Sequence, residues 1–368
     1  MEYFVQNIQP FLPDALVRIG LREVMRTTTN RLRNLDWPNK EQRLVNKIKQ
    51  LDTVTFETDA ANEQHYQVPT EFFKKHLGYR MKYSSCEWIN VVDTLDQAET
   101  YTLGQYQKKA GLDELKPGDI VLEIGNGWGS LCLFNARSYP HLQFESFSNS
   151  ETQIAYIQKQ IDDYKITNLK VWKQDIDDFV KGKAATDKVL EPTDKATSDE
   201  VTTESETTNA DKKYSRIMSI ECIEHCRAYN LLFKKLASIL KPDGLCFFQI
   251  LGHREYSYLM NDNSWMGRNF FTGGTIPSMH LFSYFNEDLI VTNTEVINGK
   301  QYAKTLDAWL HQMYKNKKEV MSIFKEAYGK DAAKMYQGWR MFYLMCSESF
   351  GYNDGKEWCV GYITMKPR

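Results

Sequence analysis

The sequence predicts an α/β fold in which helices cover both faces of a mostly parallel sheet. From about residue 119, short apolar segments alternate with amphipathic helical segments, and this alternation is typical of a parallel sheet. The first of these segments ends at a cluster of glycines, as strands do at the ligand-binding edge of such sheets. With 368 residues, of which 42% are hydrophobic and 26% charged, the chain is long enough for one large core.

Seven strands follow from the apolar pattern. Five belong to the alternating region and are expected over residues 119–125, 143–148, 169–174, 214–220 and 244–250. Helical spacing at 151–164 and 229–240 fills two of the gaps, and the second helix is closed by Lys-Pro-Asp-Gly. After an aromatic stretch, we expect a strand at 289–294, then two long helices, and a final strand at 358–365.

The rest of the chain is expected to form a helical cap and one insertion. Residues 1–115 are predicted to be the cap and lid, because the first half shows amphipathic helical spacing and a mixed polar and aromatic stretch follows it. Residues 116–368 are predicted to hold the sheet domain. Within that domain, 181–213 is acidic, rich in Ser and Thr and nearly free of apolar residues, so we expect a disordered insertion before the fourth strand.

Composition narrows the classes of partner and site. The formal net charge is −2 and no cluster of Lys and Arg stands out, so a nucleic-acid partner is not expected. No apolar run is long enough to span a bilayer, so no integral membrane span is expected. The 7 cysteines include no Cys-x-x-Cys pair, which predicts no metal site and reduced thiols in a cytoplasmic protein. The composition does not decide between a monomer and a homodimer.

The strongest motif is the glycine-rich turn after the first strand, with Gly125, Gly127 and Gly129. Glycines are needed where a turn takes positive φ and where a ligand touches the backbone. The spacing differs from the Gly-x-Gly-x-x-Gly motif of dinucleotide sites, and Glu123 stands just before the glycines. A carboxylate there suits the ammonium group of an amino-acid tail better than a pyrophosphate. The alternative is a glycine-rich turn that binds nothing.

Two further groups follow the second and third strands, at the same edge of the predicted sheet. Ser148 and Asn149, with Gln153 one turn into the next helix, are placed to bond ribose hydroxyls. Asp175 is placed to accept a hydrogen bond from an adenine amino group, with Ile176 contributing backbone. Each residue alone is more often a helix cap or turn residue. In this order, together, they favour a nucleoside-binding site.

The fourth strand leads into Glu221, Glu224 and His225, which we expect beside the reacting atoms. These residue types suit an amine that reacts as a nucleophile. Its protonated form has no free lone pair, and a carboxylate or imidazole nearby removes the proton. The spacing i, i+3, i+4 places the three side chains on one face if a helix begins there, and a capped helix start is the alternative. Aromatic walls such as Trp265, Phe270, Phe271 and Trp339 are expected to receive the amine, and a place in the core is the alternative, since rings at helical spacing are more often core residues.

These elements resemble the cyclopropane-fatty-acid-synthase-type methyltransferases. The resemblance rests on Glu-Ile-Gly-Asn-Gly-Trp-Gly-Ser at 123–130, the Ser-Asn-Ser turn and Glu-x-x-Glu-His at 221–225. Within that family, the chain is most similar to the coclaurine N-methyltransferase branch, through signatures at 61–66 (Ala-Asn-Glu-Gln-His-Tyr), 82–84 (Lys-Tyr-Ser), 271–278 and 350–358. The similarity runs from about residue 55 to the end.

The resemblance implies a class I Rossmann-like methyltransferase fold, with a seven-stranded sheet, a helical N-terminal cap and lid insertions over the substrate. It also implies S-adenosylmethionine as cofactor and a small-molecule amine as the substrate, methylated at nitrogen. Tyr83 and Ser84 would close over the cofactor. The glycine turn, Asn149, Gln153 and Asp175 would bind it. Glu221, Glu224 and His225 would position and deprotonate the amine. Cys346 falls where the lipid-modifying members have a cysteine once proposed as catalytic.

Three departures from the family pattern bear on the substrate. Asn126, Ser85 and Ser215 stand where many members have Cys, Cys and Asp. Ser85 weakens a cyclopropanation hypothesis, because the lipid-cyclopropanating enzymes use that place near a bound bicarbonate. Two alternatives remain: a lipid-modifying methyltransferase with a long apolar channel for an olefinic acyl chain, and a non-catalytic cofactor-binding scaffold.

Overall fold

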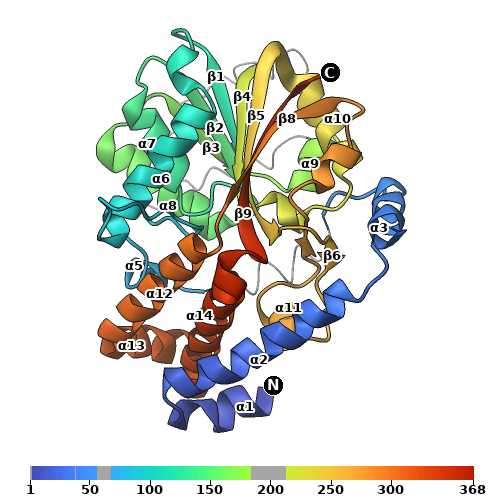
Figure 1. The fold of residues 1–368 in the computed structure, drawn as a ribbon. Coiled ribbons are helices and arrows are strands. Elements are labelled where there is room, and N and C mark those ends of the chain that lie inside the picture. The colour runs from blue at the N-terminus through green and yellow to red at the C-terminus, as the bar shows by residue number, and fades with distance from the viewer. Residues whose placement is uncertain (1, 38, 56–67, 184–212) are drawn as a thin grey trace.

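The computed structural model describes residues 2–37, 39–55, 68–183 and 213–368, which form two layers (Figure 1). A sheet with helices on both sides forms one layer, and a group of helices below one edge of the sheet forms the other. The signature at 61–66 lies outside the described residues, as does the predicted acidic insertion at 181–213 except for its two ends.

The seven strands of the sheet run in the order β3-β2-β1-β4-β5-β9-β8. Neighbours from β3 to β5 are parallel, and β9 is antiparallel to both β5 and β8. This arrangement confirms the predicted α/β fold with a mostly parallel sheet. The strand bounds are β1 (Ile120–Ile124), β2 (Gln143–Ser148), β3 (Leu169–Lys173), β4 (Tyr214–Ile220), β5 (Leu240–His253), β8 (Leu289–Ile297) and β9 (Trp358–Pro367).

Helices cover both faces of the sheet because the strands bury apolar side chains on both. Along β1, Val121 belongs to one buried apolar cluster, whereas Leu122 and Ile124 belong to the other. Figure 1 shows α6 (Leu95–Lys109), α7 (Ser130–Ser138) and α8 (Glu151–Tyr164) on one side of the sheet, and α9 (Ile176–Val180) and α10 (Tyr229–Ile239) on the other. The carboxyl edge of the parallel strands is left free to meet the second layer.

The second layer joins helices from both ends of the chain. It contains α1 (Glu2–Asn7), α2 (Asp14–Arg33), α5 (Thr70–Lys74), α12 (Lys300–Lys315), α13 (Lys317–Tyr328) and α14 (Ala332–Gly355). The prediction of two long helices after residue 294 was wrong, because three are present. The chain leaves the helical conformation at Asn316, which has neither glycine nor proline beside it to mark the break, and again at Gly329, where φ is 55°.

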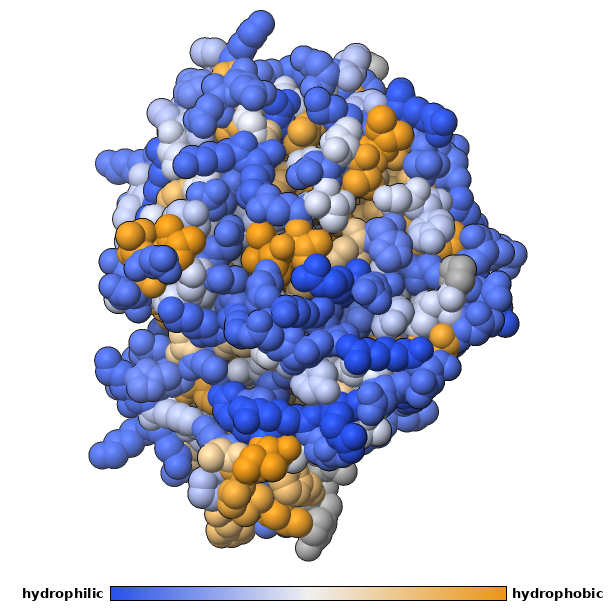
Figure 2. All heavy atoms as spheres, in the orientation of Figure 1, coloured by the Kyte–Doolittle hydropathy of each residue, from blue (hydrophilic) through white to orange (hydrophobic). Residues whose placement is uncertain are grey.

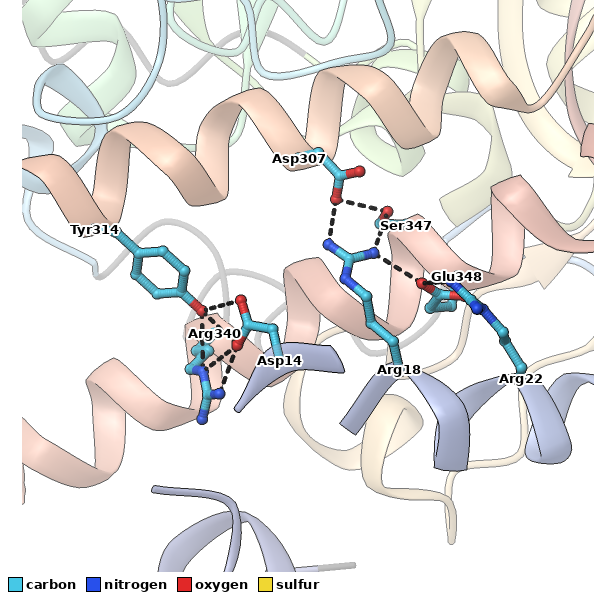
Figure 3. Close-up of polar contacts among 8 residues, drawn as sticks. All are labelled: Asp14, Arg18, Arg22, Asp307, Tyr314, Arg340, Ser347 and Glu348. Atoms are coloured by element: carbon cyan, nitrogen blue, oxygen red, sulfur yellow. Dashed lines mark hydrogen bonds and ion pairs between the residues drawn. The ribbon is translucent and has the colours of Figure 1, made fainter. Parts of the chain in front are cut away.

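Ion pairs and hydrogen bonds hold α2 against α12 and α14 (Figure 3). Arg18 pairs with Asp307 at 2.6 Å and with Glu348 at 2.8 Å, and Arg22 bonds the second oxygen of Glu348 at 2.6 Å. Nearer the start of α2, Asp14 binds the guanidinium of Arg340 on α14. These contacts place the buried face of α2 over the free edge of the sheet.

Shorter elements and the surface complete the described structure. Figure 2 shows a mostly hydrophilic face, with apolar side chains gathered at the end where Figure 1 places the N-terminal helices. No helix of the described residues is long and apolar enough to cross a membrane.

The remaining elements are α3 (Asn39–Lys49), α11 (Trp265–Asn269), β6 (Tyr258–Leu259), β7 (Thr275–Ile276) and the 3-10 turns η1 (Gln9–Phe11), η3 (Leu112–Glu114), η5 (Ile223–His225), η6 (Leu281–Tyr284) and η7 (Gly329–Asp331).

Candidate active site

A cavity of about 510 Å³ lies between the carboxyl edge of the sheet and the helical layer. Its walls come from the glycine turn after β1, the segment 82–84, the residues after β4, and helices α2, α12 and α14. Most of the sequence-predicted site residues line this cavity. Parallel strands end at one edge, which is why motifs far apart in the sequence meet there.

The three glycines are required for two different reasons. All have positive φ, at 78° for Gly125, 49° for Gly127 and 78° for Gly129. A Cβ on Gly125 would lie 2.4 Å from Sγ of Cys222, and one on Gly129 would lie 2.7 Å from the side chain of Ile157, so neither position has room for a side chain. A Cβ on Gly127 would meet nothing within 4 Å. Gly125 and Gly127 line the cavity, whereas Gly129 caps α7 outside it.

Several buried polar side-chain atoms around this turn are placed to bind a ligand. Glu123 lines the cavity, and its Oε2 atom has no hydrogen-bond partner within the described part of the chain. Burial raises the pKa of this carboxyl to about 8. Both polar atoms of the Asn126 side chain and Nε1 of Trp128 are likewise buried without a partner among the described residues. Buried polar groups are normally paired, so this cluster fits a polar, cationic ligand group such as the ammonium of an amino-acid tail.

The predicted nucleoside residues divide into two groups. Ser148 and Gln153 line the cavity and are bonded to each other, with 3.2 Å between Oγ and Oε1. Asn149, Asp175 and Ile176 do not line the cavity. The third strand ends at Lys173, and Asp175 caps α9 by accepting from the backbone nitrogen of Asp177 at 2.7 Å. Whether these side chains bind adenosine stays a prediction.

Glu221 is the most heavily bonded side chain of the site. It follows β4 with a φ of 48°, in the left-handed region, which turns its carboxylate into the cavity. Its Oε1 accepts from Ser85 N at 2.9 Å and from Gln249 Nε2 at 2.5 Å, and its Oε2 accepts from the hydroxyl of Tyr302 at 2.7 Å. Burial raises the pKa of Glu221, and the charge of Lys82 and these donors oppose that rise.

The other two predicted residues of this group take different positions. A shared face for all three side chains required a helix to begin there, and only the short turn η5 forms, preceded by the positive φ of Glu221. His225 lines the cavity and meets Phe271 edge to face, with 4.9 Å between ring centroids. Glu224 is buried and does not line the cavity; its Oε1 accepts from Leu251 N, and burial holds the pKa of this carboxyl well above its usual value.

The remaining predicted side chains are only partly gathered at the cavity. Tyr83, Ser84 and Cys346 all line it, and burial raises the pKa of the Cys346 thiol to about 12, so this sulfur is protonated at neutral pH. Of the four expected wall aromatics, Phe270 and Phe271 line the cavity. Trp265 and Trp339 do not, because they pack into the buried cluster of the helical layer.

Four residues of the site were not predicted from the sequence: Lys82, Tyr106 and Tyr302, which line the cavity, and Gln249, which donates to Glu221. A glutamine inside the apolar strand segment 246–250 is a signal that could have singled out Gln249. Tyr106 donates to Gln249 and fixes its amide, and Lys82 is fully buried. Tyr302 lies 81 residues from its partner Glu221, and no local pattern marks that pairing.

Comparisons with known proteins show which proteins this chain is similar to. The family model described as mycolic acid cyclopropane synthetase matches residues 55–190 and 180–356. The chain is 29% identical to (S)-coclaurine N-methyltransferase of Papaver somniferum, over 100% of this chain and 98% of that enzyme. The crystal structure of coclaurine N-methyltransferase bound to N-methylheliamine and SAH superposes with a TM-score of 0.84 at 26% identity, covering 99% and 98% of the two chains.

A second structural likeness shows the fold alone. The cyclopropane synthase MmaA2 from Mycobacterium tuberculosis has a TM-score of 0.64 at 19% identity, covering 85% of this chain and 99% of that one. Together these comparisons confirm the predicted class I methyltransferase fold, the family resemblance and the cofactor. The chain belongs to the mycolic acid cyclopropane synthetase family and is an S-adenosylmethionine-dependent methyltransferase.

Proposed function

We propose that this methyltransferase methylates an amine nitrogen of a small molecule. The observation that carries the proposal is that Glu221 and His225 line the same cavity as Glu123 and the glycine turn. One cavity therefore offers both groups suited to a cofactor and groups suited to a cationic acceptor. The likeness to plant N-methyltransferases supports the same acceptor chemistry.

On the cofactor side, the chain's own residues provide a polar cradle whose carboxyl, that of Glu123, would ionise beside a cation. S-adenosylmethionine, when bound, supplies a methyl group on a sulfonium sulfur. Glu123 would hold the ammonium of its amino-acid tail, since its buried Oε2 faces no donor among the residues the structure describes. The backbone at Gly125 and Gly127 allows the close approach that a side chain would block. Ser148 and Gln153 would bond the ribose hydroxyls.

On the acceptor side, we assign different roles to the two cavity-lining groups. Both oxygens of Glu221 already accept hydrogen bonds, so this carboxylate contributes fixed negative charge that attracts a cationic amine. His225 is the group we assign to take the proton from the amine nitrogen. Glu224, which precedes His225 in the chain, would stabilise the imidazolium that forms. Phe270 and Phe271 would flank the acceptor.

The test is incubation with labelled S-adenosylmethionine and a panel of amines, thiols and unsaturated phospholipids. We expect label in an amine product. We expect His225→Ala to lower kcat by about 100-fold or more while S-adenosylhomocysteine binding, measured by calorimetry, is kept. His311→Ala, which changes an exposed histidine on α12, is the matched control and should be unaffected. Label in phospholipid only, or full amine turnover by His225→Ala, contradicts the proposal.

A further inference from the structure

Lys82 is a fully buried lysine that the proposed mechanism has not used. Its side chain has 0% exposure, and its Nζ donates to Oγ of Ser84 at 2.6 Å and to the carbonyl oxygen of Ser85 at 2.5 Å. The ring of Tyr106 lies beneath it, 5.1 Å from Nζ to the ring centroid. A buried ammonium is costly unless a negative charge compensates it, so its partner matters.

Two carboxylates, those of Glu99 and Glu221, interact electrostatically with Lys82. The oxygens of Glu99 accept from the backbone nitrogens of Gly78 at 3.0 Å and Arg80 at 2.8 Å, which ties that carboxylate to the preceding loop. Glu221 instead accepts from the backbone nitrogen of Ser85, the residue whose carbonyl oxygen binds Lys82. Lys82 and Glu221 therefore hold Ser85 from its two sides.

We propose that Lys82 is a positioning residue, whose buried ammonium provides the counter-charge that keeps Glu221 ionised and its carboxylate bonded to Ser85. This inference rests on the proposed function only in that Glu221 is placed beside the reacting groups. Because Tyr83 and Ser84 line the cavity between Lys82 and Ser85, the same pair holds this cavity wall in place. Lys82 thus acts through Glu221 and need not touch the acceptor.

The other side chains that bond Glu221 do not supply a positive charge. Tyr302 and Gln249 donate neutral hydrogen bonds, and Tyr106 fixes the Gln249 amide from behind. Besides the base Lys82, the titratable groups that the structure shows interacting with Glu221 are acids: Cys86 from the wall segment, Tyr106 from α6, Glu224 from η5, Tyr302 from α12 and Cys346 from α14. His225 lines the same cavity as Glu221.

The test is a direct titration of Glu221 in the full-length protein without cofactor or acceptor. Protein labelled with ¹³C at the glutamate carboxyl carbon is titrated by NMR, and the Glu221 signal is identified by its loss in Glu221→Gln. We expect Lys82→Met to raise the midpoint of this signal by about one pH unit or more, because an opposite charge is lost. Since no methyl transfer is measured, the result is independent of the acceptor's identity.

Lys109→Met is the matched control. Lys109 also lies over a tyrosine ring, 5.2 Å from the centroid of Tyr362, but its ammonium pairs with Glu295 outside the cavity. This variant should leave the Glu221 midpoint unchanged. A midpoint in Lys82→Met equal to that of the wild type overturns the proposal.

A second measurement covers the case in which Lys82→Met does not fold. The double variant Lys82→Met/Glu221→Gln removes both charges, so the proposal expects it to accumulate as folded protein with a Tm above that of Lys82→Met. If Lys82 only fills space, the second substitution brings no recovery. A double variant as unstable as Lys82→Met would therefore refute the counter-charge role.

Discussion

At the residue scale, the burial of the Glu123 carboxyl predicts that cofactor binding releases a proton. Burial raises its pKa to about 8, so in the ligand-free protein at pH 7 it is mostly protonated. A cofactor ammonium beside it favours the ionised form and lowers this pKa, so binding at pH 7 should release close to one proton. Calorimetry in buffers of different ionisation enthalpy measures this release.

Two checks belong to the Glu123 prediction. Glu123→Gln should bind the cofactor more weakly and without the buffer dependence, and the wild type at pH 9.5 should release no proton because Glu123 is already ionised. A binding enthalpy at pH 7 that is equal in all buffers would show that Glu123 does not meet the ammonium.

The glycine turn gives a second prediction at this scale. Gly125→Ala adds a Cβ that meets Cys222 at 2.4 Å in addition to the strain of positive φ, whereas Gly127→Ala adds only that strain. We expect Gly127→Ala to lower the free energy of unfolding by about 1–2 kcal/mol, and Gly125→Ala to lower it by about 1–3 kcal/mol more. Urea unfolding of the ligand-free variants measures both. Equal losses would mean that the close approach to Cys222 is relieved at no cost.

The same residues show what the sequence could and could not predict about the site. The glycines and Glu123 were predictable because a strand, a tight turn and a buried acid leave a local pattern. Asp175 is ambiguous from sequence, since an aspartate that follows a strand caps a helix as readily as it binds a ligand, and here it caps α9. Lys82 and Tyr302 were missed because their function arises from contacts with Glu221 and Ser85 that only the fold creates.

At the scale of elements, the attachment of α2 determines one wall of the cavity. Met25, Thr28 and Arg31 of this helix line the cavity, and Glu348 of α14 holds the helix through Arg18 and Arg22 (Figure 3). The Glu348 side chain is 8% exposed, while that of Arg22 is 61% exposed. Solvent therefore screens part of this network.

We expect Glu348→Gln to lower the free energy of unfolding by about 1–3 kcal/mol, because Arg18 and Arg22 lose the charge that binds them. The KM for the acceptor should rise, since α2 is held less firmly over the cavity. The matched control is Glu23→Gln on the same helix, whose pair with Arg26 is 60% exposed on both sides and should matter by less than about 1 kcal/mol. Urea unfolding and steady-state kinetics test this, and equal effects of the two variants would contradict it.

Element prediction from the sequence succeeded where burial is periodic. All seven strands of the sheet were expected, because buried strands between turn residues carry strong apolar patterns. The start of β5 at Leu240 was not, since it depends on pairing with Tyr214 of β4, and the short turn η5 was not expected either. The division of the C-terminal helices at Asn316 has no glycine or proline to announce it.

At the scale of the whole molecule, the helical layer and the sheet share one core. A single buried cluster contains Leu21 of α2, Phe72 of α5, Val121 of β1, Met218 of β4 and Leu344 of α14. The sequence suggested a boundary near residue 115 between a cap and a sheet domain. Yet α12 to α14, which follow that boundary, pack in the same layer as α2, and the cavity lies between this layer and the sheet.

We therefore propose that the layer and the sheet unfold together. Neither can bury its half of the shared cluster alone, so exposing one exposes the other. Native-state hydrogen exchange should give the same opening free energy for the slowest amides of α14 and of β4, equal to the free energy of unfolding by urea. If α14 opened at a lower free energy than β4, the helices would be a lid on an independently stable sheet, and the cavity wall that they form would be adjustable separately from the cofactor site.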